Sequence, residues 1–183
     1  MQAEAFCSQK SVSLTCNKLR RFDLAKSDRL LGRLELLRTL HREILIPPAV
    51  WREVGIDGQL LAEGQALAQA RTDGWVRVLT PGAEPVPPDL ELEQLDDGER
   101  EAIVLALELG ALLVIDERDG RAVATRLGLR LTGTLGLLVE AKNRALIPSL
   151  RTELDRLLVE TNFRCAESLL QKALLEAGEI SPS

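Results

Sequence analysis

An aspartate directly after an apolar run is the residue of this chain best suited to chemistry. Asp116 follows Ala111–Ile115 and opens the stretch Asp-Glu-Arg-Asp-Gly-Arg. A short apolar run that stops abruptly is typical of a central parallel strand, and ligands of open α/β sheets collect beyond the carboxyl ends of such strands. An Asp at a strand-to-helix turn also often serves only to cap the helix. Both roles stay open for Asp116 at this point.

A glutamate at the start of a predicted helix is the second candidate. Glu99 shares a helix face with apolar residues such as Ile103 and Ala106, which points it inward near the end of the sheet where Asp116 emerges. The alternative is structural, because Asp96 and Glu99 have the spacing of a capping box in which Glu99 bonds back to the Asp96 amide.

A third acid and the absence of nitrogen or sulfur ligands suggest which cation would bind. Glu53 lies beside the apolar stripe of a predicted helix that carries Val50 and Val54, although a lone helical glutamate is more often solvated. Several acids that face one another are unfavourable unless a cation neutralises them. Oxygen ligands without His or Cys select Mg²⁺ or Mn²⁺.

Other kinds of site are excluded or secondary. The three cysteines are far apart and His41 is the single histidine, so neither zinc spacing nor a disulfide framework is present. Walker A and Rossmann glycine patterns are also missing. Gly133-Thr134-Leu135-Gly136 offers a hydroxyl and amides at a helix start, either for a phosphate or water contact or as an N-cap Thr with glycines that allow close packing.

Strand and helix patterns alternate along the chain. Strands are expected over 12–16, 43–46, 75–79, 111–115 and 129–132, with helices between them and strand-free helices over 148–159 and 166–177. This order predicts an α/β fold, a three-layer α/β/α sandwich with a mainly parallel central sheet and a C-terminal helical tail. We expect one domain over 1–160, with a divergent N-terminal part over 1–32, and the tail over 161–183.

Composition favours a soluble, cytoplasmic protein. The hydrophobic content is 45% and the net charge is -5, but no run approaches the ~18 apolar residues of a membrane helix and no signal peptide is recognisable. Lys and Arg predominate over 10–42 and 118–156, whereas acids predominate over 43–101. An acidic centre with basic rims suits a metal-dependent enzyme that acts on a polyanion, although charges scattered on solvated helices would give the same pattern.

Four segments together resemble the PIN-domain family, and within it a VapC-like branch of bacterial and archaeal proteins. They are Ile46-Pro-Pro-Ala-Val-Trp-Arg-Glu53, Leu95-Asp-Asp-Gly-Glu-Arg-Glu-Ala-Ile103, Val114-Ile-Asp-Glu-Arg-Asp-Gly-Arg121 and Leu131-Thr-Gly-Thr-Leu-Gly136. The resemblance implies a parallel-sheet nuclease whose acidic cluster binds Mg²⁺ or Mn²⁺ and hydrolyses RNA. By position it assigns Glu53, Glu99 and Asp116 as catalytic and metal-binding acids, with Asp119 as an auxiliary ligand.

The chain departs from this family at the first acidic place. The matching residue is Asn17, followed by Lys-Leu-Arg where family members usually have Thr/Ser-Ser-Pro. Asn ligates a hard cation through its carbonyl oxygen but supplies no charge, so the metal affinity should fall. Asp23 is the substitute to consider if the N-terminal helix is displaced.

Two functions from different classes follow. The first is a toxin-like, metal-dependent endoribonuclease of a toxin–antitoxin system, with RNA as substrate, an antitoxin as partner and a homodimer as an allowed assembly. The second is a catalytically impaired PIN fold that binds RNA or an antitoxin, for which Asn17 is the motive. A phosphoacceptor role of Asp116 on a flavodoxin-like sheet is a third alternative, and it lacks a second acidic pair.

Overall fold

The structure is a computed structural model that describes residues 11–14, 29–53, 62–82, 92–160 and 163–181. Its described strands form one sheet in the order β3-β2-β1-β4-β5, and every pairing between them is parallel. The strands are β1 (Ser11–Leu14), β2 (Glu43–Ile46), β3 (Val76–Val78), β4 (Leu112–Val114) and β5 (Leu131–Thr132). The carboxyl ends of these strands therefore meet at one edge of the sheet.

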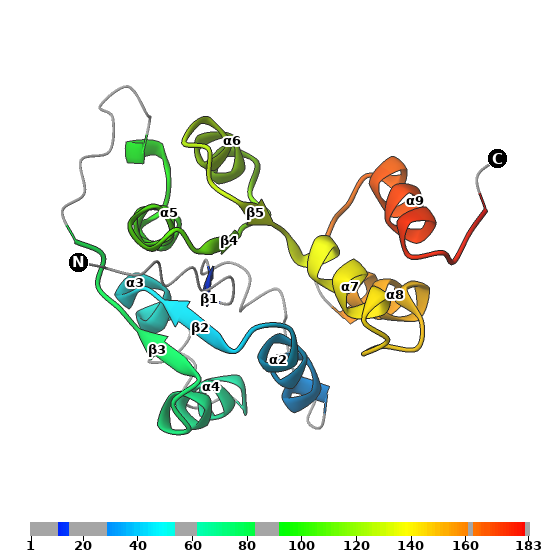
Figure 1. The fold of residues 1–183 in the computed structure, drawn as a ribbon, viewed down its shortest axis with the longest axis horizontal. Coiled ribbons are helices and arrows are strands. Elements are labelled where there is room, and N and C mark those ends of the chain that lie inside the picture. The colour runs from blue at the N-terminus through cyan, green and yellow to red at the C-terminus, as the bar shows by residue number, and fades with distance from the viewer. Residues whose placement is uncertain (1–10, 15–28, 54–61, 83–91, 161–162, 182–183) are drawn as a thin grey trace, which may run out of the picture.

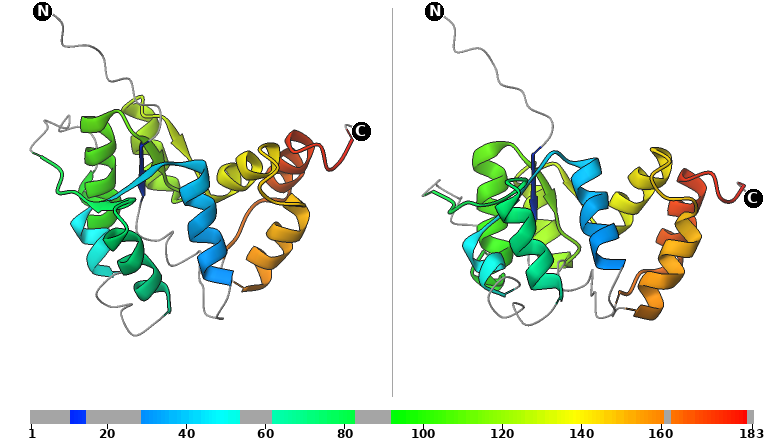
Figure 2. Two further views of the ribbon diagram at one scale, coloured as in Figure 1. Left: turned by 60° about the horizontal axis from the view of Figure 1, so that its bottom comes forward. Right: turned by 90° about the horizontal axis from the view of Figure 1, so that it is seen from below.

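Helices cover both faces of the sheet, as Figures 1 and 2 show. On one face lie α5 and α6, and on the other lie α2 and α4, while α7 to α9 extend beyond β5. The helices are α2 (Arg29–Leu40), α3 (Pro48–Trp51), α4 (Ala62–Thr72), α5 (Asp97–Leu109), α6 (Arg118–Arg126), α7 (Thr134–Asn143), α8 (Leu150–Glu160) and α9 (Glu167–Glu176). The predicted three-layer α/β/α sandwich with a parallel sheet is confirmed.

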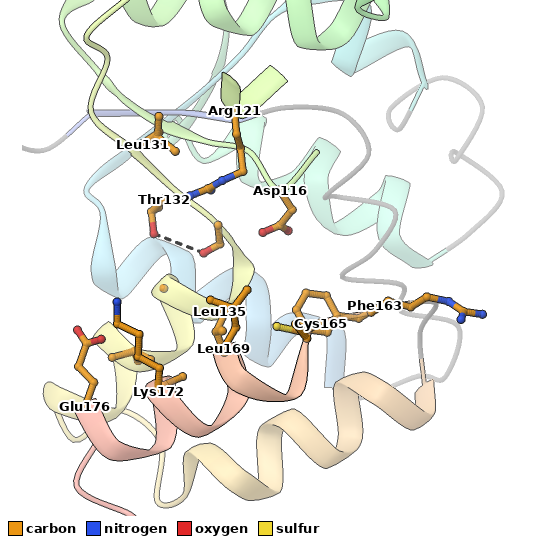
Figure 3. A pocket seen from close by; sticks show the side chains of 16 residues that line it. Asp116, Arg121, Leu131, Thr132, Leu135, Phe163, Cys165, Leu169, Lys172 and Glu176 are labelled. Atoms are coloured by element: carbon orange, nitrogen blue, oxygen red, sulfur yellow. Dashed lines mark hydrogen bonds between the residues drawn. The ribbon is translucent and has the colours of Figure 1, made fainter. Parts of the chain in front are cut away.

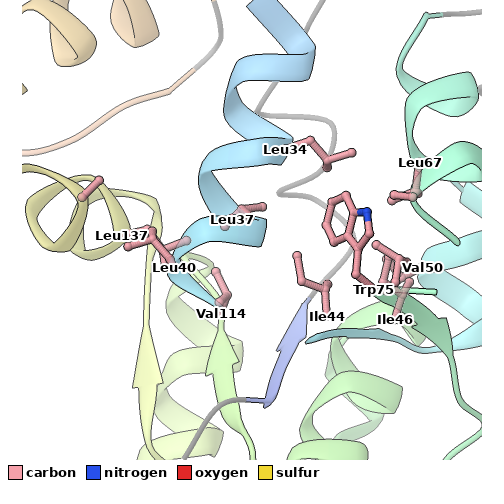
Figure 4. Packing of buried hydrophobic residues seen from close by; sticks show 13 residues of the cluster. Leu34, Leu37, Leu40, Ile44, Ile46, Val50, Leu67, Trp75, Val114 and Leu137 are labelled. Atoms are coloured by element: carbon pink, nitrogen blue, oxygen red, sulfur yellow. The ribbon is translucent and has the colours of Figure 1, made fainter. Parts of the chain in front are cut away.

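Side chains of the strands alternate between two hydrophobic clusters. Val114 lies near Leu37 and Leu40 of α2 on one face of the sheet, in a cluster that extends to Trp75 (Figure 4). Leu113 and Ile115 pack on the other face against α5 and α6. A strand buried on both faces reads as a continuous apolar run, which is the pattern that predicted β4. Each such fully buried side chain stabilises the fold by roughly 1.5–3 kcal/mol.

The C-terminal helices form a third cluster with α7. Leu138 and Val139 of α7 pack against Leu154 of α8 and Leu174 of α9. Glu179, just after α9, links α9 to α8. Its carboxylate accepts hydrogen bonds from the amides of Leu150 (2.6 Å) and Arg151 (2.9 Å) at the start of α8. The described segment 163–181 is thus packed onto α7 and α8.

The predicted elements agree with the structure within a few residues where it describes them. The predicted strand 43–46 coincides with β2, and α4 at Ala62–Thr72 lies in the helical stretch predicted between strands 43–46 and 75–79. Within the described parts of the chain, the structure has no helix that is both long and apolar enough to cross a bilayer.

Candidate active site

The carboxyl edge of the sheet brings together the ends of elements that are distant in sequence. Asp116 follows β4, and Gly133 and Thr134 follow the neighbouring β5. Helix α5 precedes β4 and returns across the sheet, so its first turn, with Glu99, faces the same edge. In open parallel sheets this edge is where ligands bind.

Asp116 caps a helix, but not the one that follows it in sequence. Its Oδ1 accepts from the Thr134 amide (2.9 Å) and its Oδ2 accepts from the Thr134 hydroxyl (2.7 Å). These bonds place the half-buried carboxylate at the N-terminus of α7, whose own N-cap residue, Gly133, has no side chain to serve there. The helix dipole favours the ionised carboxylate.

Gly133 is required beside this carboxylate because a side chain would displace it. A Cβ built on Gly133 would lie 2.1 Å from Asp116 Oδ1 and 3.4 Å from Arg121 Nη1. Arg121 is itself fixed, since its Nη1 donates to the Ile115 carbonyl (2.7 Å). The site therefore has a cation held close to its carboxylate, and the sequence analysis missed this arginine. Arg121 could have been found from its position, because it lies six residues after Ile115, on the first helix after β4.

Glu99 is buried at the start of α5, with 5% of its surface exposed. The first half of the predicted capping box is present, because Asp96 Oδ1 accepts from the Glu99 amide (2.7 Å). The Glu99 side chain lies against the first turn of α6, where a Cβ built on Gly120 would be 3.4 Å from Oε1 and 2.4 Å from Ile115 Cδ1. A glycine at 120 thus lets α6 pack closely on a buried carboxylate.

The remaining predicted site residues differ in how the structure places them. Glu53 is half-buried just after α3, which packs on α5 because Glu101 Oε2 accepts from the Ala49 amide (2.8 Å). Asp119 is exposed in the first turn of α6. Asn17 lies outside the described residues, as does its alternative Asp23.

The donors at this edge have the chemistry of a Mg²⁺ or Mn²⁺ site, since they are carboxylate oxygens without His. Among the described residues, however, no three His, Cys, Asp or Glu side chains lie close enough together to hold one metal ion. The described residues thus place Glu99 and Asp116 at this edge without completing a metal site.

A cavity of about 460 Å³ opens beside Asp116 (Figure 3). Asp116 and Arg121 line one side, Lys172 of α9 lines the opposite side, and Leu135 of α7 and Leu169 of α9 lie between them. The sequence predicts a C-terminal helical tail over 161–183, and nothing in the periodicity of α9 indicated that it borders the same cavity as Asp116.

Cys165 also lines this cavity. Burial raises the pKa of its thiol above the ordinary value, and the charges of Asp116 and Glu167 add to this rise, while a hydrogen bond with the Ala166 backbone opposes it. The thiol is therefore protonated near neutral pH. The Cys165 thiol is thus a poor nucleophile, and its slow alkylation can report whether the cavity is occupied.

Comparison with known proteins identifies the fold. The model of DUF3368, described as a PIN domain, matches residues 29–179. The chain belongs to this PIN-domain family. No curated protein matches it. Among solved structures it is similar to a PilT N-terminus domain protein from the hyperthermophilic archaeon Sulfolobus solfataricus, with 20% identity, a TM-score of 0.47, and coverage of 72% of this chain and 92% of that chain.

Membership of the PIN family assigns a nuclease-type fold, and PIN domains in general depend on a divalent metal. The family resemblance expected from the four sequence segments is thus confirmed, and the VapC-like branch stays a prediction.

Proposed function

We propose that the protein is a Mg²⁺- or Mn²⁺-dependent endoribonuclease of the toxin type, with RNA as substrate and an antitoxin as partner. Glu99 and Asp116 are its principal catalytic and metal-binding residues, and Glu53, Asp119 and Asn17 belong to the same site. The observation that carries the proposal is the placement of two carboxylates, one buried and one half-buried, at the carboxyl edge of a PIN-type sheet.

Glu99 and Asp116 would hold the metal, which when bound would supply an activated water and offset negative charge on the phosphodiester. The chain's own residues orient the site. Thr134 holds both oxygens of Asp116, which fixes the carboxylate in one rotamer. Arg121, held by the Ile115 carbonyl, places a guanidinium where a phosphate that approaches Asp116 would meet it. Burial of Glu99 excludes water from its side of the site.

The test is cleavage of a fluorescent single-stranded RNA with Mg²⁺, with Mn²⁺ and with EDTA. We expect metal-dependent cleavage by the wild type and its loss in Asp116→Asn and Glu99→Gln. Asp155→Asn, which removes an exposed acid of α8, is the matched control and should keep the wild-type rate. Cleavage that is equal in Asp116→Asn and in the control would refute the assignment and indicate a contaminating nuclease.

A second function, an impaired PIN module that binds RNA or an antitoxin, has one observation in its favour. The described residues bring no three potential ligands together, and the first acidic place of the family is filled by Asn17. This function predicts RNA binding without metal-dependent turnover. The variant Asn17→Asp separates the two functions, because it should create metal-dependent cleavage in an impaired enzyme and only increase it in an active one.

A further inference from the structure

The cavity beside Asp116 has the two kinds of surface that a nucleotide requires. Arg121 and Lys172 approach it from opposite walls, and Leu135 and Leu169 supply an apolar surface between them (Figure 3). Its volume of about 460 Å³ falls within the ~300–1,000 Å³ range of small-ligand sites. Because the cavity includes Asp116, anything bound in it adjoins the proposed catalytic centre.

We propose that this cavity binds one nucleotide of a single-stranded RNA, the one adjoining the scissile phosphate, with its phosphate between Arg121 and Lys172 and its base against Leu135 and Leu169. The proposal rests on the proposed function and makes α9 the element that selects which nucleotide is accepted.

The charges around the cavity suit this arrangement. Arg121 donates through Nη1 to the Ile115 carbonyl, and its guanidinium has further N–H groups that can bind a phosphate. Its Nη1 and the Asp116 carboxylate both lie close to Gly133. Lys172 is exposed on α9 and supplies a second cation. Glu176, one turn later on the cavity wall, offers an acceptor to an N–H group on the edge of a base.

A single strand is required because the base must enter the cavity. In an RNA duplex the bases are stacked inside the helix, whereas unpaired nucleotides can turn a base outward onto a protein surface. Leu169 is 52% exposed at the cavity although it is apolar, and a stacked base would cover it. The α9 wall of the cavity is held in place, because Glu179, just after α9, accepts hydrogen bonds from two amides at the start of α8.

The test compares two leucines of the same helix. Leu169 and Leu175 are both exposed, at 52% and 43%, but Leu175 does not line the cavity. The probe is a fluorescent single-stranded oligouridylate, titrated by anisotropy in EDTA so that no cleavage occurs. We expect Leu169→Glu to weaken binding at least about tenfold and Leu175→Glu to change it by less than about twofold, since contacts with one base are worth about that factor.

Cys165 provides a second readout that locates the RNA. Its alkylation by a maleimide, followed by peptide mapping, should slow when the oligouridylate is present, in the wild type and in Leu175→Glu but not in Leu169→Glu. Equal binding by the two leucine variants, unprotected Cys165, or no binding by the wild type would each overturn the subsite. Because both measurements are made without metal, they are independent of the cleavage assay. Cleavage without Cys165 protection overturns the subsite alone, and protection without cleavage overturns only the nuclease.

Discussion

Two corners of the molecule use the same device, a carboxylate that caps a helix remote in sequence, in different surroundings. At the carboxyl edge of the sheet, Asp116 accepts from the amide and hydroxyl of Thr134 at the start of α7. At the C-terminal corner, Glu179 accepts from two amides at the start of α8 and from the Ser149 hydroxyl (3.3 Å). In both, a helix N-terminus fixes an anion.

The corners differ in what lies next to the carboxylate. Glu179 has the ammonium of Lys142 at 3.4 Å and takes no part in the cavity. Burial alone would raise the pKa of Glu179, but the hydrogen bonds from Arg151, Leu150 and Lys142 outweigh it and hold the pKa below the ordinary value. Asp116 instead borders a cavity and lies at the same edge as buried Glu99. Capping alone therefore does not identify a functional acid, and its surroundings do.

The largest predicted effect is a contrast between Asp116→Asn, which should lower cleavage, and Glu179→Gln, which should lower stability. Asp116→Asn should reduce metal-dependent RNA cleavage by roughly 10²- to 10⁴-fold, because a metal ligand is lost. It should change the free energy of unfolding by less than about 1 kcal/mol, since the Asn carbonyl can still accept from the Thr134 amide and the Asn NH2 can donate to the Thr134 hydroxyl oxygen.

Glu179→Gln should do the reverse, with cleavage kept and the free energy of unfolding lowered by about 1–3 kcal/mol, because charge-assisted bonds to α8 are lost. Urea unfolding and RNA cleavage on the same preparations measure both. If Glu179→Gln abolishes cleavage or Asp116→Asn unfolds the protein, the distinction between the two corners is wrong.

Gly133→Ala should disturb the surroundings of Asp116 without replacing an acidic residue. In Gly133→Ala the new methyl group would meet Asp116 Oδ1 at 2.1 Å, so the carboxylate must leave Thr134. We expect a loss of about 1–3 kcal/mol of stability together with most of the cleavage activity. Gly120→Ala is the companion, because its methyl group meets the flexible end of Ile115 and approaches Glu99 at only 3.4 Å. Its effect should be smaller, and a larger effect would show that Glu99 is the more constrained acid.

The stabilisation that Glu179 provides at the start of α8 should depend on pH. The folded pKa of Glu179 is lower than the ordinary glutamate value of about 4.3, so its stabilisation is complete above that pH and is lost as the pH falls through the folded pKa. The difference in Tm between wild type and Glu179→Gln should therefore narrow on acidification below about pH 4.3. A difference that stays constant down to the folded pKa would mean that charge is not what holds the corner.

The smallest effect concerns His41, at the opposite edge of the sheet from Asp116. Burial lowers its pKa, Glu140 opposes this and Arg144 adds to it. Below about pH 6.5 the unfolded chain binds a proton that the folded chain does not, so stability falls as the pH drops from there toward the folded pKa. His41→Gln should flatten this slope. The single histidine of the chain makes the pKa directly measurable by NMR, and a value above 6.5 would contradict the expectation.

The sequence predicted the fold and the positions of the main acids because both depend on local pattern. The apolar run before Asp116 marks a buried strand, and the amphipathic start of α5 turns Glu99 inward. It did not predict which helix Asp116 caps, because Thr134 is eighteen residues away in sequence and only the pairing of β4 with β5 brings the two together. The roles of Arg121 and α9 depend equally on tertiary packing.

The most direct test of the account is calorimetric titration with Mn²⁺ of the wild type, Asp116→Asn and Glu179→Gln. We expect Mn²⁺ to bind the wild type and Glu179→Gln, and to bind Asp116→Asn at least about tenfold more weakly, since Asp116 is a proposed metal ligand and Glu179 is not. Equal Mn²⁺ affinity in all three proteins, or none in the wild type, would contradict the claim that Asp116 belongs to a metal site.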